Sequence, residues 1–252
     1  MDTTGTFDGA QGEKDSLRAL LSTALGDAGI EVTDEQLGLL ATHLELVIDR
    51  NSTINLTRIT TPREAAYLHV VDSLLLRGAV DSAPSGPFVD VGTGAGYPGI
   101  PLAIVTRRKA MLVDSVKKKI AAVQDFVNLL GLVSRVSTDS CRIEELGRTQ
   151  RGRYSAVTAR AVAQTNVLVE YAAPLLRKDG RLILAKGNVS DEELAAGDRA
   201  ADICGMRRVS RETFELPNRM GHREVIVYQR VANPRIKLPR NTGMAKHHPL
   251  GV

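Results

Sequence analysis

The sequence predicts an α/β fold in which a mostly parallel sheet is covered by helices on both faces. Three observations lead to this prediction. Strand-like runs alternate with helix-length segments beyond residues 84–87, as they do in parallel sheets. Two consecutive strand-like runs joined by a short connection end this region, which is typical of an antiparallel hairpin that closes a sheet. Roughly 60 residues of helical pattern precede the first strand-like run and predict a helical extension.

The N-terminal extension combines helical apolar spacing with a helix-start pattern. Thr33 and Gln36 match a capping box, with the hydroxyl at the N-cap position and the glutamine three residues later. The stretch NSTINLTRITTP then breaks the helical pattern. Within an extension over residues 16–80, we expect helices from Leu17 to Ile30, from Thr33 to about Arg50, and from Pro62 to about Arg77. Residues 1–15, rich in Gly, Thr and Asp, are expected to be disordered.

Residues 84–231 are predicted to form one Rossmann-like domain. The parallel strand-like runs are FVDV (88–91), AMLVD (110–114), SAVTAR (155–160) and GRLILAKG (180–187). The helix-length segments span residues 98–107, 116–130, 164–177 and 190–203. MRRVSRETFEL (206–216) and HREVIVYQRV (222–231) are expected to pair as the closing hairpin.

The charge of the chain is unevenly distributed. Its formal net charge is +4, yet residues 230–252 contain five Lys or Arg residues and no acid, and residues 1–15 contain four acids and one lysine. A basic terminal segment is typical of an arm that contacts nucleic-acid phosphates. Charge alone fits a solvated tail equally well. Residues 232–252 are therefore described as a basic C-terminal tail with these two interpretations.

Composition argues against several other classes of protein. No window approaches the ~18 apolar residues of a membrane span, and the first residues lack the cationic and apolar regions of an export signal. Cys141 and Cys204 lie far apart without CxxC spacing or nearby histidines, so neither a disulfide framework nor a metal site is indicated. We expect a cytoplasmic protein without a metal, and a monomer because no apolar stripe calls for a partner.

A glycine-rich turn follows the first predicted strand. In FVDVGTGAGYPGIP (88–101), Gly92, Gly94 and Gly96 occupy every second position. Glycine permits a sharp turn and close approach of a ligand, and ligands of open parallel sheets bind at the carboxyl ends of the strands. A dinucleotide fingerprint, G-x-G-x-x-G, would need glycine where Tyr97 stands. G-x-G-x-G after an acid resembles instead the S-adenosylmethionine loop of class I methyltransferases.

The second predicted strand supplies an acid that fits such a ligand. Asp114 ends this strand, 22 residues after Gly92, where a carboxylate can accept hydrogen bonds from ribose hydroxyls. This acid indicates an adenosine-containing ligand but does not distinguish NAD from S-adenosylmethionine. The loop and the acid alone leave two alternatives open, namely a dinucleotide-binding enzyme and a glycine turn that is required only for packing.

Further motifs resemble those of one family. DVGTGAGYPGIPLAIV is accompanied by NLT (55–57), HVVDS (69–73), LVDSVKKKIA (112–121), RIEE (142–145), ARAV (159–162) and AKG (185–187). Together they are similar to the glucose-inhibited division protein B family, the small-subunit rRNA guanine-N7 methyltransferases. The resemblance covers about residues 35–230, and PRIKLPRNTGMAKHHPL is similar to the basic tail of many members.

This resemblance implies both a fold and a function. The fold is that of a class I S-adenosylmethionine-dependent methyltransferase, with a seven-stranded sheet, a terminal antiparallel hairpin and an N-terminal helical extension. The substrate is 16S rRNA in the small ribosomal subunit, methylated at N7 of a guanosine in the decoding-region loop. Loss of the methyl group is associated with low-level streptomycin resistance in bacteria that carry this family.

The resemblance also implies site residues. It places cofactor contacts at Gly92, Tyr97, the Ile143-Glu144 pair and Arg160, although Tyr97 replaces the Phe or Leu that is common at this position. Together with the glycine loop and the strand-end acid, the expected cofactor-binding set is Gly92, Gly94, Gly96, Tyr97, Asp114, Ser115, Ile143, Glu144 and Arg160.

Methylation at guanine N7 needs few catalytic groups. N7 carries a lone pair and no proton, so no general base is required and catalysis rests on orientation. Arg160 and Lys186 end neighbouring predicted strands. We expect Arg160 to bind the cofactor or RNA, and Lys186 to contact guanine O6, because a donor on N7 would block the attack. A surface ion pair is the alternative for each residue.

Two other groups of residues favour structural roles. His69 and Asp72 lie on one helix face and are interpreted as a hydrogen-bonded network that anchors the extension, rather than as a proton relay. Lys117, Lys118 and Lys119 are interpreted as a solvated helix face, with RNA contact as the second interpretation.

Three competing functions remain to be weighed. A small-molecule methyltransferase is disfavoured by the basic tail. A dinucleotide oxidoreductase is disfavoured by Tyr97. A protein that senses S-adenosylmethionine, or scaffolds ribosome assembly without turnover, is not excluded by the sequence.

Overall fold

The computed structural model describes the backbone of residues 6–252 and the side chains of residues 16–252. Before the sheet lie α1 (Thr6–Asp27), α2 (Asp34–Asn51), α3 (Pro62–Ala65), the π-helical segment η1 (Ala66–Val71), α4 (Asp72–Leu74) and α5 (Arg77–Asp81). Of the segment expected to be disordered, residues 1–5 lie outside the described residues. The rest is helical, because α1 begins at Thr6, well before Leu17, and includes the good helix formers Ala, Gln, Glu and Lys.

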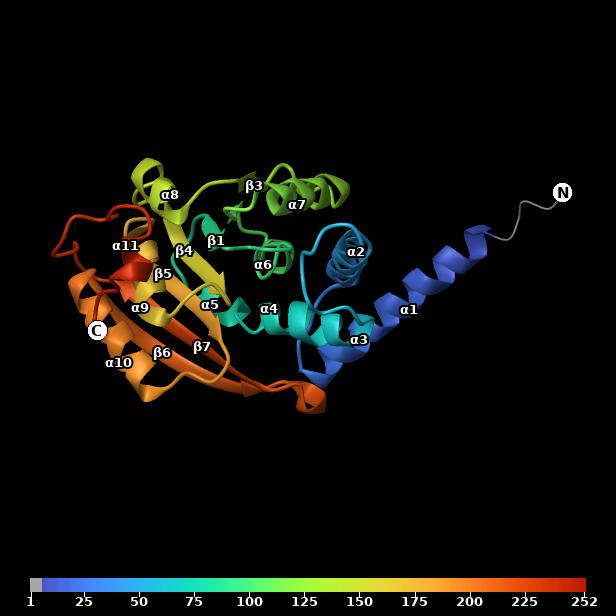
Figure 1. Ribbon diagram of the computed structural model, residues 1–252. Helices are drawn as coiled ribbons and strands as arrows, with labels where there is room; N and C mark the ends of the chain where they lie inside the picture. Colours follow the sequence, from blue (N-terminus) through green and yellow to red (C-terminus); the bar gives the residue numbers. More distant parts are fainter. Residues whose placement is uncertain (1–5) are drawn as a thin grey trace.

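The sheet has seven strands in the order β3-β2-β1-β4-β5-β7-β6 (Figure 1). The strands are β1 (Phe88–Val91), β2 (Ala110–Val113), β3 (Val136–Asp139), β4 (Tyr154–Arg160), β5 (Leu176–Lys186), β6 (Met206–Glu215) and β7 (His222–Arg230). All neighbouring pairs from β3 to β5 are parallel, and β7 is antiparallel to both β5 and β6. The predicted fold is therefore confirmed, including its closing hairpin, while β3 is an additional edge strand.

Helices connect the strands in the expected alternation. They are α6 (Gly99–Thr106), α7 (Lys117–Leu129), α8 (Ile143–Thr149), α9 (Thr165–Ala172), α10 (Asp191–Ile203), the 3-10 turn η2 (Pro217–Arg219) and α11 (Met244–His247). Helix α9 is shorter than predicted because β5 already begins at Leu176. None of the described helices combines the length and apolarity needed to cross a bilayer.

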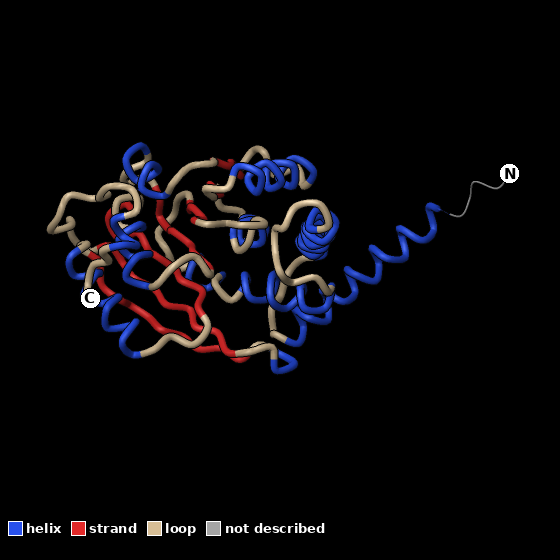
Figure 2. Tube along the Cα trace, in the orientation of Figure 1, coloured by secondary structure: helices blue, strands red, loops and turns tan. Residues whose placement is uncertain are grey.

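The two faces of the sheet carry separate cores. One core joins the helices before the sheet, α6 and α7 to side chains such as Phe88 and Leu112. The other joins α8, α9 and α10 to Val89 and Val113 of the same strands. This alternation follows from the period of two in a strand, and Figure 2 shows helices on both sides of the sheet.

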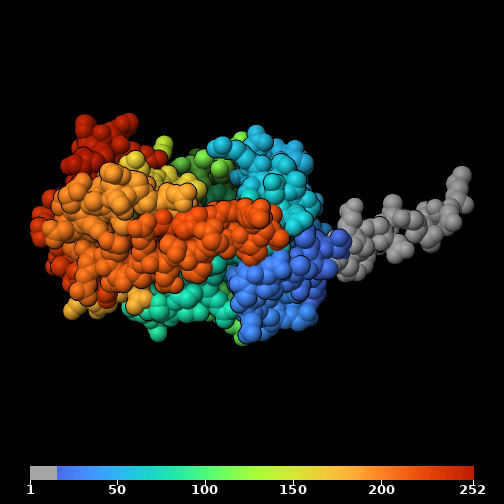
Figure 3. All heavy atoms as spheres, turned by 90° about the horizontal axis from the view of Figure 1, so that it is seen from below, coloured from blue at the N-terminus to red at the C-terminus, as the bar shows by residue number. Residues whose placement is uncertain are grey.

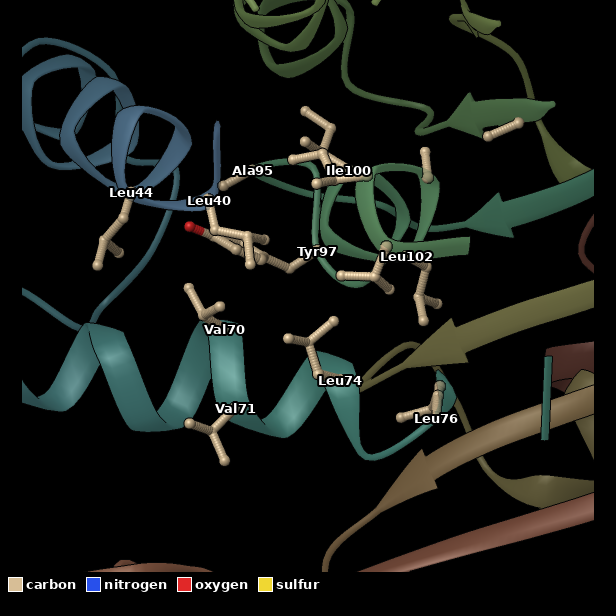
Figure 4. Close-up of a cluster of buried hydrophobic side chains, with 14 of the residues drawn as sticks. Leu40, Leu44, Val70, Val71, Leu74, Leu76, Ala95, Tyr97, Ile100 and Leu102 are labelled. Atoms are coloured by element: carbon tan, nitrogen blue, oxygen red, sulfur yellow. The ribbon is translucent and has the colours of Figure 1, made fainter. Parts of the chain in front are cut away.

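The N-terminal helices pack through an apolar face that the sequence pattern predicts. Thr33 forms the expected capping box with Gln36 at the start of α2. Leu40 and Leu44 of this helix are fully buried, and each burial contributes about 1.5–3 kcal/mol. Figure 4 shows these leucines and Tyr97 between α2 and the helical segment that carries Val70 and Leu74. The extension is therefore an integral part of the domain.

The strand order creates a crevice at the carboxyl ends of the strands. The chain passes from β1 outward to β2 and β3, then returns to the other side of β1 at β4. Such a reversal leaves a crevice between the connections that leave the two central strands. The N-terminal helices and the C-terminal residues lie toward opposite ends of the molecule (Figures 1 and 3).

Candidate cofactor cavity and its two walls

A cavity of about 370 Å³ lies at the carboxyl ends of the central strands. It brings together most of the residues that the sequence predicts for cofactor binding, namely Gly92, Gly94, Tyr97, Asp114, Ser115, Ile143, Glu144 and Arg160. Gly96 does not line the cavity. A Cβ atom there would lie 2.7 Å from Ile100 Cδ1 and 3.1 Å from His43 Nε2, so this glycine permits close packing of the loop instead.

The glycine loop and Asp114 form one hydrogen-bonded unit. Gly92 and Gly94 adopt φ values of 72° and 60°, a conformation that favours glycine. The carboxylate of Asp114 accepts hydrogen bonds from the backbone N–H groups of Gly94 at 3.1 Å and Val116 at 2.9 Å. These bonds hold the carboxylate at the cavity, and its remaining lone pairs fit the hydroxyls of a ribose.

The acid before the glycine loop has a different role from Asp114. Asp90 is fully buried and accepts hydrogen bonds from Gly99 N at 3.0 Å and Thr158 Oγ1 at 2.9 Å. Burial raises the pKa of Asp90 to about 6, against the effect of these hydrogen bonds. A Cβ atom on Gly99 would lie 2.2 Å from Leu112 Cδ2, so helix α6 approaches the sheet closely at this point. Asp90 therefore fixes the start of α6 beneath the loop.

One wall of the cavity forms where the N-terminal helices meet the glycine loop and the end of β4. We call it the N-terminal wall, and it consists of His43, His69, Asp72, Tyr97 and Arg160 with their direct partners. Its centre is the buried ring of Tyr97, which stacks on His69 at 4.7 Å with an interplanar angle of 12°. His43 contacts the same ring at 4.5 Å, and the Arg160 guanidinium lies 5.6 Å from its centroid. Burial, with a smaller contribution from the charge of Arg160, lowers the pKa of His69 to about 3. His69 is therefore uncharged at neutral pH.

Charged groups complete the N-terminal wall. Arg160 Nη1 donates to Leu68 O at 2.8 Å and to Asp72 Oδ2 at 3.1 Å. Arg223 Nε donates to the other carboxylate oxygen of Asp72 at 3.0 Å. His69 Nε2 and Thr57 Oγ1 are 3.0 Å apart. The predicted network of His69 and Asp72 is thus confirmed, and it anchors the helical extension beside the cavity.

The opposite wall comes from residues 238–250, which we call the C-terminal wall. Gly243 N donates to Glu144 Oε1 at 2.8 Å, and Lys246 lines the cavity. Arg240 forms a salt bridge with Glu170, whose side chain is only 3% exposed. Leu238 and Ala245 are buried in the second core. The basic tail is therefore not a purely solvated tail over these residues, because it packs on α8 and α9, and its contact with nucleic-acid phosphates stays a prediction.

Lys186 lies outside this cavity. Its ammonium donates to Ala163 O at 2.7 Å and to Glu193 Oε1 at 2.7 Å, so the alternative of an ion pair is present. Lys186 lines instead a second cavity of about 390 Å³, which shares His69, Arg160 and Ala161 with the first. Of the two residues expected to act in catalysis, Arg160 therefore lines both cavities, whereas Lys186 lines only the second.

Several lining residues were not predicted as cofactor contacts. They include Leu56, Thr57, Lys119, Cys141, Tyr171 and Lys246. The NLT motif was the available signal for Leu56 and Thr57, but nothing in the sequence links Lys246 to the glycine loop.

Burial and neighbouring acids raise the pKa of Cys141 to about 12, so this thiol is protonated and is no nucleophile. Among the side chains of residues 16–252, no group of three His, Cys, Asp or Glu is arranged to hold a metal ion.

Comparison with families and curated proteins agrees with this geometry. The model of the family rRNA small subunit methyltransferase G (GidB) matches residues 36–222. The ribosomal RNA small subunit methyltransferase G of Synechococcus elongatus is 41% identical over 209 residues, which cover 81% of this chain and 86% of the relative. The protein of the same name from Carboxydothermus hydrogenoformans is 36% identical over 240 residues, covering 93% of this chain and all of the relative.

Solved structures share the fold at low sequence identity. A geranyl diphosphate methyltransferase in complex with S-adenosylmethionine is 13% identical, with a TM-score of 0.53, covering 67% of this chain and 90% of that one. A 1,6-didemethyltoxoflavin-N1-methyltransferase from Burkholderia thailandensis with bound S-adenosylhomocysteine is 16% identical, with a TM-score of 0.53, covering 76% and 90%. Both likenesses concern the sheet and its helices.

Proposed function

The chain belongs to the rRNA small subunit methyltransferase G family, and on this premise we propose that it methylates N7 of a guanosine in the decoding-region loop of 16S rRNA. The cofactor is S-adenosylmethionine. The observation that carries the proposal is one cavity that joins the glycine loop, Asp114 and Arg160 at the carboxyl ends of the central strands. The family match then supplies the substrate class.

The cofactor fits the polar groups that line the first cavity. Asp114 offers acceptors for the ribose hydroxyls, and the Ile143-Glu144 pair lies at the side of the cavity formed by the start of α8. Gly92, Gly94 and Ser115 supply close backbone approach or a small polar side chain. Arg160 offers a cation for the cofactor carboxylate. Gly96 supports this site only through the packing of the loop.

The residues around the cavity suit a reaction without proton removal. When bound, S-adenosylmethionine supplies a methyl group that moves to the N7 lone pair as the carbon–sulfur bond breaks, and the positive charge passes from sulfur to guanine. The product needs no base. His69, the imidazole of the N-terminal wall, has a pKa near 3 and is a poor base at neutral pH. The remaining task of the protein is to orient the two reactants.

Arg160 and Lys186 are proposed to hold the reactants. Arg160 lies at the boundary of both cavities, where it can bind the cofactor carboxylate while Asp72 fixes its guanidinium. Within the described residues, Lys186 uses two of its three N–H donors, and the third is proposed to bind guanine O6. Lys119 and Lys246 at the first cavity are candidates for contacts to RNA phosphates, which position a substrate without reading its sequence.

The cellular setting is proposed from the same family membership. An enzyme that modifies the small ribosomal subunit works in the cytoplasm. A monomer is proposed because the few exposed large apolar side chains of the described chain, such as Leu129 and Val209, come from separate elements. Loss of the enzyme is expected to give low-level streptomycin resistance.

A methyl-transfer assay tests the proposed function. Labelled S-adenosylmethionine is offered with small subunits that lack the modification, or with protein-free rRNA, and nucleosides are analysed by mass spectrometry. We expect N7-methylguanosine at one position. Tight binding of the cofactor without RNA labelling would instead favour a non-catalytic sensor or a methyltransferase with another acceptor.

A further inference from the structure

A second cavity adjoins the one assigned to the cofactor. It lies where β4 and β5 end, and Lys186, Gly187 and Arg223 line it. It shares His69, Arg160 and Ala161 with the first cavity. A molecule held in the second cavity would therefore meet the cofactor across these three residues.

The second cavity is lined by residues with hydrogen-bond donors that find no acceptor in the described part of the chain. Arg223 donates from Nε to Asp72 and from Nη1 to His222 O at 2.8 Å. Its Nη2 has no hydrogen-bond partner within the described part of the chain. Lys186 keeps one N–H free as well. Two cationic donors thus border the same cavity.

This arrangement selects among nucleobases. Guanine carries the acceptor O6, whereas adenine carries a donor, the N6 amino group, at the same position. Two cationic donors therefore favour guanine and oppose adenine. Aliphatic side chains of Ile59, Leu68 and Ala185 supply apolar surface for a flat base. A base within an RNA loop can enter such a pocket once it is unstacked from its neighbours.

We propose that the second cavity binds the target guanine, with Arg223 and Lys186 donating to O6 and leaving N7 without a donor. This inference rests on the proposed function and adds a specificity residue, Arg223, which comes from the closing hairpin. The cofactor occupies the first cavity and the base occupies the second, so that N7 meets the methyl group beside Arg160.

Filling the second cavity tests this assignment. A Cβ atom on Gly187 would meet no heavy atom within 4 Å, so a side chain fits there without moving the backbone. With full-length protein, we expect Gly187→Leu to bind S-adenosylmethionine within about two-fold of wild type in calorimetry. Its kcat/KM for small subunits should fall about 100-fold, as expected for a misplaced reactant. Gly78→Leu, at an exposed glycine of α5 with equally open space, is the control and should keep full activity.

A second variant tests the guanine contact itself. Arg223→Gln should lower kcat/KM roughly 10- to 100-fold, with cofactor affinity unchanged. The double variant with Gly187→Leu should be little worse than Gly187→Leu alone, because both changes act on the same bound base. Weaker cofactor binding by Arg223→Gln would mean that Arg223 acts only through Asp72, and would overturn the assignment.

The two levels of the proposal fail in different ways. Full methylation by Gly187→Leu beside an active wild type would overturn the guanine cavity alone. An inactive wild type that binds S-adenosylmethionine would overturn the proposed function and, with it, this inference.

Discussion

The two walls of the cofactor cavity are built in contrasting ways. The N-terminal wall is a continuous stack in which Tyr97 lies against His43 and His69, and Asp72 is held by two arginines. The C-terminal wall meets the cavity at Lys246 and through the hydrogen bond from Gly243 to Glu144. The first wall is centred on buried rings at the cavity itself, whereas the second is anchored in the other core by Leu238 and Ala245 and reaches the cavity through few contacts.

The two walls should therefore differ in how strongly a substitution changes the free energy of unfolding together with ligand binding. The stacked rings of the N-terminal wall are shared with the packing of α2 and η1, so a change in these rings or in Arg160 affects folding and cofactor binding together. The contacts of residues 241–252 with the cavity are few and lie at the surface, and such elements open at low free-energy cost. We therefore expect the effects of substitutions to decrease from the N-terminal wall to the C-terminal wall.

The largest effect is expected for Arg160→Ala. This change leaves the Asp72 side chain, which is 8% exposed, with one cationic partner fewer, and it removes the donor to Leu68 O. Because Arg223 still pairs with Asp72, the cost is that of a lost hydrogen bond to a charged group, and the free energy of unfolding in urea should fall by about 1.5–3 kcal/mol. Cofactor binding should be lost as well.

Arg208→Ala is the matched control for this prediction. Arg208 and Asp198 also form a two-point salt bridge, but their side chains are 33% and 38% exposed. We expect a loss of about 0–1 kcal/mol. Equal losses in the two variants would show that the N-terminal wall is not structurally special.

The next effect concerns pH. Burial lowers the pKa of both His43 and His69 from 6.5 to about 3. The unfolded chain therefore takes up protons between pH 6.5 and 3 that the folded chain does not. The uncharged histidines therefore stabilise the folded state fully above pH 6.5, and this contribution to the free energy of unfolding is lost as the pH falls towards 3. At pH 5 each histidine accounts for a loss of about 2 kcal/mol.

His43→Gln isolates one of these contributions. Glutamine retains a side-chain N–H for Ala95 O, which His43 Nε2 contacts at 3.1 Å, but it does not titrate in this range. Between pH 7 and pH 5, the variant should lose about 2 kcal/mol less than wild type in urea unfolding. The raised pKa of Asp90 acts with the opposite sign and cancels in this comparison. Identical pH slopes would contradict the prediction.

Removal of the cavity-lining part of the C-terminal wall should weaken binding and spare the fold. A chain that ends at Arg240 keeps the salt bridge to Glu170 but loses Gly243 and Lys246. We expect the Kd for S-adenosylmethionine to rise about ten-fold, as for one or two lost hydrogen bonds. The free energy of unfolding should fall by about 1–3 kcal/mol, because Ala245 leaves the second core and the buried Asn166 Nδ2 loses its acceptor, Leu250 O. Arg235→Ala, which removes an exposed tail charge away from the cavity, should leave the Kd unchanged.

The smallest effect should distinguish two lysines of the same tail. Lys237 and Lys246 are both exposed, and neither side chain has a hydrogen-bond or ion-pair partner within the described residues. Only Lys246 lines the cavity. Lys246→Ala should raise the Kd for S-adenosylmethionine about two- to three-fold, as expected of a single exposed charge, and Lys237→Ala should not. Equal effects would mean that the tail acts only through its overall charge.

The sequence predicted best what depends on neighbouring residues. The capping box at Thr33, the glycine turn after β1 and the acid at the end of β2 each depend on short-range backbone chemistry. Strand β3 was not predicted because its sequence, VSTD, is short, polar and largely exposed at the sheet edge. Regular patterns are weak in such a strand.

Long-range pairing explains the rest of what was missed. Gly243 and Glu144 are 99 residues apart in sequence, and Asp72 and Arg223 are 151 apart. No local pattern in the basic tail indicates that it packs on α8 and α9. The position of Lys186 in a separate cavity likewise depends on how β4 and β5 align, which the motif alone does not specify.

In the π-helical segment η1, the number of residues matters as much as which residues they are. A π turn accommodates one residue more than an α-helical turn. His69 lies within η1, and η1 ends directly before Asp72, the first residue of α4. Deleting one residue from η1 would restore a regular helix and rotate one side of it by about 100° relative to the other. Asp72 would then point away from Arg160 and Arg223 although no side chain of the cluster had been altered. An insertion or deletion in this short stretch should therefore disrupt the cluster even where every side chain of the cluster is retained.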